Sequence, residues 1–309
     1  MTAQRDDAAP AADVRREDVE PEDSRGGPAA DWRHDPGFKW PEKVPWSVLG
    51  PDFIHAWGFD LPRGKREHLE VVGPSGSGKT HLVETILQDH YREADRRRQA
   101  DRRKHLETGG IFVATKTDDD IFREMGWPVA HSVRDIQDTN LIFWPRTGKS
   151  GQDRDDHVGR HVGDLLRQLW RPRANTVLAF DEIGYVEGLG GDMRKRVQQY
   201  WREGRALGIQ VIGMKQRPQG ALRDMHSETF WTVSFKPGDD ADQERFAQLF
   251  GHKRDWQPVL DALNLDDHEF LIKHSRTGEA YISWVDTPLR PQKIRRQRGI
   301  AGMVSGGRA

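Results

Sequence analysis

A glycine-rich stretch of the sequence places one lysine and one threonine in a spacing that binds phosphate groups. The octapeptide G-P-S-G-S-G-K-T occupies residues 73–80, after the apolar run L-E-V-V and before the helical pattern H-L-V-E-T-I-L. In a strand, loop and helix of this kind, glycines let successive backbone N–H groups point at a bound anion, and the helix adds the positive end of its dipole. The stretch therefore predicts a binding site for nucleotide phosphates.

Each part of this phosphate loop has a task in binding a nucleotide. Gly76 and Gly78 allow the backbone to turn around the phosphates, and Lys79 neutralises the β- and γ-phosphates. The hydroxyl of Thr80 is expected to ligate the Mg²⁺ ion that bridges them. A glycine-serine turn that fits by chance is the alternative, which the flanking patterns disfavour. The predicted nucleotide-binding residues are Gly73, Pro74, Ser75, Gly76, Ser77, Gly78, Lys79, Thr80 and His81.

Two adjacent carboxylates follow a second apolar run. The residues T-V-L-A-F at 176–180 predict a buried strand, and Asp181 and Glu182 come directly after it. Because the carboxyl ends of parallel strands meet at one edge of a sheet, these acids are expected beside the phosphate loop. We assign Asp181 to the Mg²⁺ shell and Glu182 to the general base that activates water. A water-activating Glu favours hydrolysis, and a nucleotide or nucleoside kinase is the less favoured alternative.

A third polar residue, Gln216, comes just after the predicted strand Gln210–Met214. Because its strand is expected beside the strand that bears the acids, the amide of Gln216 is expected near the γ-phosphate, where it would sense the nucleotide or orient water. An ordinary loop glutamine is the alternative.

The sequence also contains two patterns typical of GTPases, but we reject recognition of guanine. The residues T-K-T-D at 115–118 and D-E-I-G at 181–184 fit two GTPase patterns, but their order in the chain is reversed. ATP is the predicted nucleotide.

Short apolar runs alternate with helical patterns along most of the chain. This alternation predicts an α/β fold whose mostly parallel, twisted sheet is covered by helices on both faces. The predicted strands are Leu69–Val72, Ile111–Ala114, Leu141–Trp144, Val177–Phe180, Gln210–Met214, Thr229–Phe235, Glu269–Lys273 and Ala280–Trp284. The predicted helices are Lys79–Arg103, Asp119–Glu124, His157–Trp170, Asp192–Leu207 and Asp240–Phe250.

The formal net charge of -1 over 309 residues hides a sorted distribution of charge. Residues 1–36 carry a charge of -5 and almost no large apolar side chain, so we predict a disordered acidic arm. Residues 290–309 carry a charge of +6 and no acid, which predicts a flexible basic tail. The ATPase domain is expected at residues 37–289.

Cysteine is absent from the sequence, which excludes disulfides, thiolate metal sites and cysteine nucleophiles. No apolar run approaches the ~18 residues of a membrane span, and the N-terminus lacks the apolar centre of a signal peptide. These features predict a cytoplasmic protein that is not inserted into a membrane.

Two further motifs carry a family resemblance. Residues 205–209 read R-A-L-G-I, and residues 215–218 read K-Q-R-P. Together with the phosphate loop and Asp181–Glu182, they resemble the FtsK/HerA superfamily of DNA-pumping P-loop ATPases over roughly residues 50–285. The chain departs from the family pattern at Lys215, where Thr is usual. Membrane segments and a recognisable winged-helix DNA reader are also missing, which leaves a minimal motor domain similar to phage or viral packaging ATPases and mobile-element transfer motors.

The resemblance implies a RecA-like P-loop NTPase that assembles into a ring, commonly a hexamer, around double-stranded DNA. It also implies that ATP lies between subunits and that a neighbouring subunit supplies an arginine to the site. We assign Arg205 to this role, with Arg217 and Arg202 as alternatives. The competing interpretation is that Arg205 is an ordinary solvated or salt-bridged arginine. The implied activity is ATP hydrolysis that translocates or packages duplex DNA, with phage or mobile-element proteins as partners. An ATP-dependent switch or scaffold without translocation is the alternative.

Two groups of cations are candidate DNA contacts. Arg194, Lys195 and Arg196 stand at a predicted helix start, where a dipole favours acids, so we interpret them as binding an external anion; a solvated loop is the alternative. In the basic tail, unpaired cations would bind DNA phosphates by releasing counterions. The tail candidates are Arg295, Arg296 and Arg298.

Overall fold

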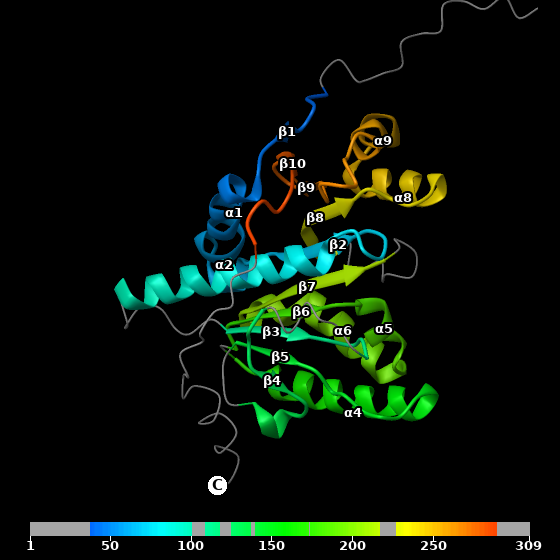
Figure 1. Ribbon diagram of the computed structural model, residues 1–309. Coiled ribbons are helices and arrows are strands. Elements are labelled where there is room, and N and C mark those ends of the chain that lie inside the picture. The colour runs from blue at the N-terminus through cyan, green and yellow to red at the C-terminus, as the bar shows by residue number, and fades with distance from the viewer. Residues whose placement is uncertain are drawn as a thin grey trace, which may run out of the picture.

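The computed structural model describes residues 38–100, 109–117, 125–136, 140–172, 174–216 and 227–288. The predicted acidic arm, the basic tail and the predicted helix Asp119–Glu124 lie outside these residues. The described residues form one ten-stranded sheet of order β1-β10-β9-β8-β2-β7-β6-β3-β5-β4 (Figure 1). The strands are β1 (Glu42–Lys43), β2 (His68–Val72), β3 (Gly109–Val113), β4 (Val129–Ala130), β5 (Leu141–Phe143), β6 (Thr176–Phe180), β7 (Ile209–Lys215), β8 (Thr229–Phe235), β9 (Phe270–His274) and β10 (Ala280–Ser283).

Seven adjacent strands, from β8 to β4 in the sheet order, run parallel to one another. Beyond β8 the direction changes. Among the described strand pairs, only those of β9 with β8 and with β10 are antiparallel. The turn between β9 and β10 is tight, and Gly278 supplies its left-handed backbone with φ +77°. The predicted α/β fold with a mostly parallel sheet is confirmed.

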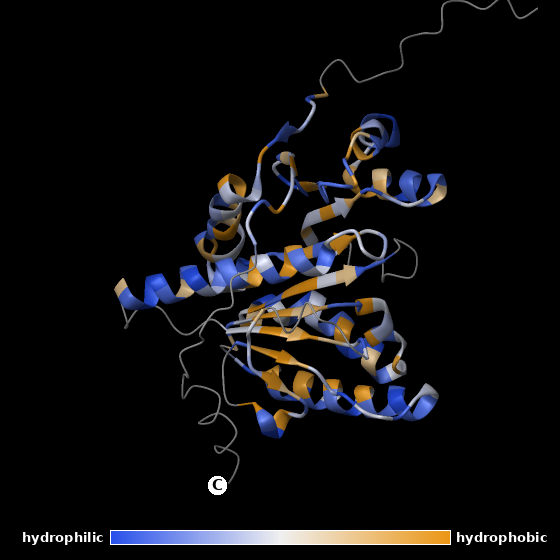
Figure 2. Cartoon of the chain, in the orientation of Figure 1, coloured by the Kyte–Doolittle hydropathy of each residue, from blue (hydrophilic) through white to orange (hydrophobic). Residues whose placement is uncertain are grey.

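Helices cover both faces of the sheet. The helices are α1 (Trp46–Ile54), α2 (Lys79–Ala100), α4 (Gly151–Leu169), α5 (Ile183–Gly188), α6 (Gly191–Glu203), α8 (Asp240–Phe250) and α9 (Lys253–Asp261). Alternate strand residues point to opposite faces: Val177 and Ala179 pack with α1 and α2, whereas Leu178 and Phe180 pack with α4, α5 and α6. In Figure 2 the central strands are mostly hydrophobic, and the outer sides of α2 and α4 are mostly hydrophilic.

The main differences from the sequence-based prediction are local. The predicted helix Asp192–Leu207 is divided, because α6 ends at Glu203 and a tighter 3₁₀ turn, Gly204–Leu207, follows it. Gly208 then ends this segment in the left-handed conformation with φ +82°, as its position before the strand predicts. The short helices α1, α5 and α9 were not predicted. Within the described residues, no helix combines the length and apolar character needed to cross a membrane.

Candidate functional site

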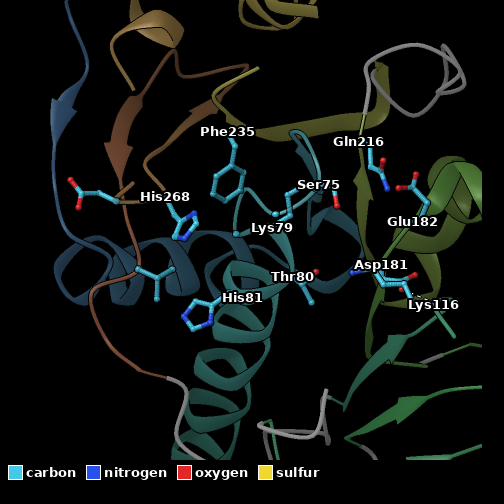
Figure 3. Close-up of a pocket in the computed structure, with 14 residues that line it drawn as sticks. Ser75, Lys79, Thr80, His81, Lys116, Asp181, Glu182, Gln216, Phe235 and His268 are labelled. Atoms are coloured by element: carbon cyan, nitrogen blue, oxygen red, sulfur yellow. Dashed lines mark hydrogen bonds between the residues drawn. The ribbon is translucent and has the colours of Figure 1, made fainter. Parts of the chain in front are cut away.

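A cavity of about 540 Å³ opens at the carboxyl edge of the parallel strands (Figure 3). Its position follows from the sheet order, because β7 lies between β2, which leads into the phosphate loop, and β6, which leads into the two acids. The structure therefore brings most of the predicted site residues around one space. Those that line it are Ser75, Gly76, Gly78, Lys79, Thr80, His81, Asp181, Glu182 and Gln216.

The phosphate loop has the conformation for which its glycines are needed. Gly76 and Gly78 have φ values of +78° and +101°, a region that side-chain-bearing residues rarely adopt. The loop ends where α2 begins at Lys79, so the helix N-terminus faces the cavity. The remaining predicted residues support the loop: Gly73 donates its N–H to the carbonyl of Lys215, and Ser77 donates to the carbonyl of Pro74.

Lys79 is folded back onto its own loop. Its ammonium donates hydrogen bonds to the carbonyl oxygens of Gly73 at 2.7 Å and Pro74 at 2.6 Å. Burial lowers the pKa of Lys79 to about 8; the negative charge of Glu182 opposes this shift and the positive charge of Lys116 adds to it. An arriving polyphosphate would favour the charged form of Lys79 and offer it stronger acceptors than these carbonyls.

Asp181 is almost completely buried and firmly oriented. Its carboxylate accepts hydrogen bonds from the Thr115 N–H at 3.0 Å, the Thr115 hydroxyl at 2.5 Å and the Lys116 N–H at 3.4 Å. Burial raises the pKa of Asp181, and these hydrogen bonds together with the charge of Lys116 oppose the rise. The end of β3 thus fixes a carboxylate opposite the start of α2.

Glu182 occupies a less enclosed position at the same edge. Burial and the charge of Asp181 raise its pKa, whereas Lys79 and Lys116 lower it. A carboxylate that is raised in pKa by its surroundings and faces a cavity is suited to accept a proton from water. Gln216 faces the cavity from the end of β7 (Figure 3), which is the neighbourhood predicted for it.

The donor set at this edge fits Mg²⁺. Mg²⁺ prefers oxygen ligands, and it is commonly held by one or two carboxylates together with substrate phosphates and water. Thr80 supplies a hydroxyl from the first turn of α2, and Asp181 supplies a carboxylate from the end of β6; both line the cavity (Figure 3). These two residues would therefore hold the ion together with a bound nucleotide.

Five residues that line the cavity were not among the predicted site residues: Lys116, Phe235, Asp267, His268 and Val285. Lys116 and Phe235 stand at the carboxyl ends of β3 and β8, so the rule that placed the acids would also have found them. Lys116 entered the sequence analysis only through the rejected GTPase pattern. Asp267, His268 and Val285 come from irregular segments next to β9 and β10, and no local pattern marks them.

Arg205 lies away from this cavity, in the 3₁₀ turn that precedes β7 and thus at the opposite edge of the sheet. Its guanidinium pairs with the carboxylate of Glu228 at 2.9 Å and lies 5.3 Å from the ring centroid of Phe230. It cannot act in the site of its own subunit, and its role toward a neighbour stays a prediction. Arg202 lies beside Arg205 in a second cavity, and Arg217 lies outside the described residues.

The predicted DNA contacts are only partly described. Arg194 and Lys195 are exposed on α6, and Arg196 is half-buried; Arg295, Arg296 and Arg298 lie outside the described residues. One argument for the α6 cluster was wrong. The helix begins at Gly191 and carries Asp192 in its first turn, so its start does have the acid that the dipole favours. Arg194 and Lys195 stay candidate DNA contacts because they are exposed cations, and the helix dipole no longer supports that prediction.

No protein-family model and no curated protein sequence matches the chain. Among solved structures, it is similar to the genome packaging NTPase B204 from Sulfolobus turreted icosahedral virus 2, with a TM-score of 0.49 and 14% identity over 72% of this chain and 97% of that one. It is also similar to the pCW3 conjugation coupling protein TcpA, with a TM-score of 0.46 and 13% identity over 79% of this chain and 69% of that one. For the cytoplasmic domain of the Thermomonospora curvata type VII secretion ATPase EccC, the TM-score is 0.45 and the identity 15%, over 72% of this chain and 26% of that one. At these identities and TM-scores the likeness concerns the fold alone.

The lowered pKa of Lys79 predicts how nucleotide affinity changes with pH. Lys79 is charged below its pKa of about 8 and neutral above it, and only the charged form attracts phosphates. The association constant for MgATPγS should therefore be flat below that pH and fall by up to about tenfold per pH unit above it. Calorimetry between about pH 7 and 9.5 measures this. Lys79→Ala should bind more weakly without such a slope, and a wild-type affinity that stays constant up to pH 9.5 would contradict the assignment.

Proposed function

We propose that this protein is an ATP-hydrolysing P-loop motor that translocates or packages double-stranded DNA as a ring. The observation that carries the proposal is the convergence of the phosphate loop, Asp181, Glu182 and Gln216 on one cavity. A phosphate-binding loop alone would support binding. The additional carboxylate pair and amide supply what hydrolysis needs.

In the proposed reaction the loop N–H groups and Lys79 bind the triphosphate and hold its γ-phosphate at the edge of the sheet. Mg²⁺, held by Thr80 and Asp181, would neutralise charge on the phosphate oxygens. Glu182 takes the proton of the attacking water, and Gln216 orients that water from β7. Lys79 and Asp181 are buried, which strengthens their charge interactions with the bound triphosphate and its ion.

The ring and the DNA contact rest on the motif resemblance and on the placement of cations. Arg205 would reach a neighbour's nucleotide from the opposite edge of the sheet, as a ring with sites between subunits requires. Arg194 and Lys195 are exposed on α6, which follows Glu182 after only the short helix α5. Movement at Glu182 would thus be passed to cations that contact DNA phosphates, and the predicted basic tail would add further contacts.

Replacement of the proposed base separates binding from hydrolysis. Glu182→Gln keeps the side chain's size and removes its ability to accept a proton, so turnover of ATP should fall about 100-fold or more while MgATP binding persists. Steady-state phosphate release and calorimetry measure the two quantities. Glu203→Gln makes the same change on the exposed side of α6 and should leave both unchanged. Retained hydrolysis in Glu182→Gln would remove its assignment as the base.

The DNA partner is tested by the dependence of turnover on DNA. Duplex DNA at low salt should raise the ATPase rate severalfold, and this stimulation should weaken as salt rises, because phosphate contacts release counterions. Exchange of both Arg194 and Lys195 for Ala should reduce the stimulation without changing the rate in the absence of DNA. Exchange of Lys253 and Arg254 on α9 is the matched control. An ATPase rate that duplex DNA does not alter would favour the switch or scaffold over the motor.

A further inference from the structure

The cavity continues past the phosphate loop on the side away from the two acids. In Figure 3, His81, Phe235 and His268 lie to one side of Lys79, and Asp181, Glu182 and Gln216 lie to the other. His81 comes from the first turn of α2 and Phe235 from the end of β8, while His268 comes from the loop before β9. This end of the cavity therefore presents rings where the other end presents acids.

The backbone of His268 is in an unusual conformation. Its φ of +51° is in the left-handed region, which residues other than glycine seldom adopt. The next residue secures the loop: the carboxylate of Glu269 accepts the N–H of Asn264 at 2.9 Å and the ammonium of Lys43 at 2.8 Å. The His268 N–H also donates to the carbonyl of Leu265 at 3.1 Å. These bonds hold a strained residue at the cavity wall, a combination that is typical of ligand-binding positions.

Both rings rest directly on the phosphate loop. A Cβ at Gly78 would lie 3.3 Å from the Cβ of His268 and 3.4 Å from the ring of Phe235. A Cβ at Gly73 would lie 2.8 Å from the Cβ of Phe235. Two glycines of the loop thus allow the rings to approach closely. Any group joined to bound phosphates on this side must pass alongside them.

We propose that His268, with Phe235 and His81, binds the nucleoside of the triphosphate whose phosphates occupy the loop, so that the site prefers a nucleoside triphosphate over bare polyphosphate. The inference rests on the proposed ATP site and adds the residues that recognise its other half. Planar rings stack on a planar base. Imidazole nitrogens can exchange hydrogen bonds with the ribose or the base, and Asp267 at the same wall can accept them from ribose hydroxyls.

The test compares one probe that has a nucleoside with one that has none: MgATPγS and magnesium tripolyphosphate, titrated into the full chain. His268→Ala should weaken the affinity for MgATPγS about tenfold and leave the affinity for tripolyphosphate within about twofold of the wild-type value. The Michaelis constant for ATP should rise, with little change in the turnover number. His268→Asn tolerates the left-handed backbone, so it removes the ring without the strain of Ala and should give the same pattern. His252→Ala changes an exposed histidine outside the cavity and is the control.

Three results would overturn the inference. If His268→Ala and His268→Asn lost affinity for both probes equally, His268 would only shape the phosphate loop. If they lost affinity for neither probe, His268 would contact no ligand. Wild-type protein that binds tripolyphosphate as tightly as MgATPγS would also exclude a nucleoside contact while leaving the phosphate loop intact. Failure of the proposed function looks different, because wild-type protein would then bind neither probe.

Discussion

The burial of opposite charges at one edge of the sheet is the constraint on which the site depends. Asp181 and Glu182 have pKa values raised by burial, and Lys79 has a pKa lowered by it. Buried charges are costly unless they are paired. Lys79 and Glu182 favour each other's charged forms and Lys116 favours both carboxylates, whereas Asp181 opposes the charge of Glu182 and Lys116 opposes that of Lys79. A triphosphate with Mg²⁺ would complete this arrangement, since it brings both the anion that Lys79 lacks and the cation that the acids lack.

The order of the strands creates this arrangement. Because β7 pairs with both β2 and β6 in parallel, the phosphate loop, Gln216 and the two acids leave neighbouring strands at the same edge. Strand β7 also follows the turn that contains Arg205. Gln216, which lines the cavity of its own subunit, is at the carboxyl end of β7, and Arg205, which we propose reaches a neighbour's site, is at the other end. A ring of such subunits would connect consecutive sites through a single rigid strand.

Local patterns together with the strand-edge rule predicted the phosphate loop, Asp181, Glu182 and Gln216. The parallel sheet that brings these residues to one cavity is confirmed, and their roles stay predictions. His268 could not be predicted, because only the pairing of β9 with β8 brings its loop to the cavity, and that pairing leaves no local signal. The dipole argument at α6 failed for another reason: Asp192 is the first residue of the predicted helix and the second of α6, so the first turn holds an acid with either boundary.

The central claim is that ATP hydrolysis at this cavity moves duplex DNA, and displacement of a third strand measures that movement directly. The protein would be added, at low salt and with Mg²⁺, to duplex DNA that carries a fluorescent triplex-forming oligonucleotide. We expect ATP-dependent release of the oligonucleotide by the wild-type protein, and none by Glu182→Gln or with ATPγS. Steady ATP hydrolysis on bound DNA without release of the oligonucleotide would contradict the account.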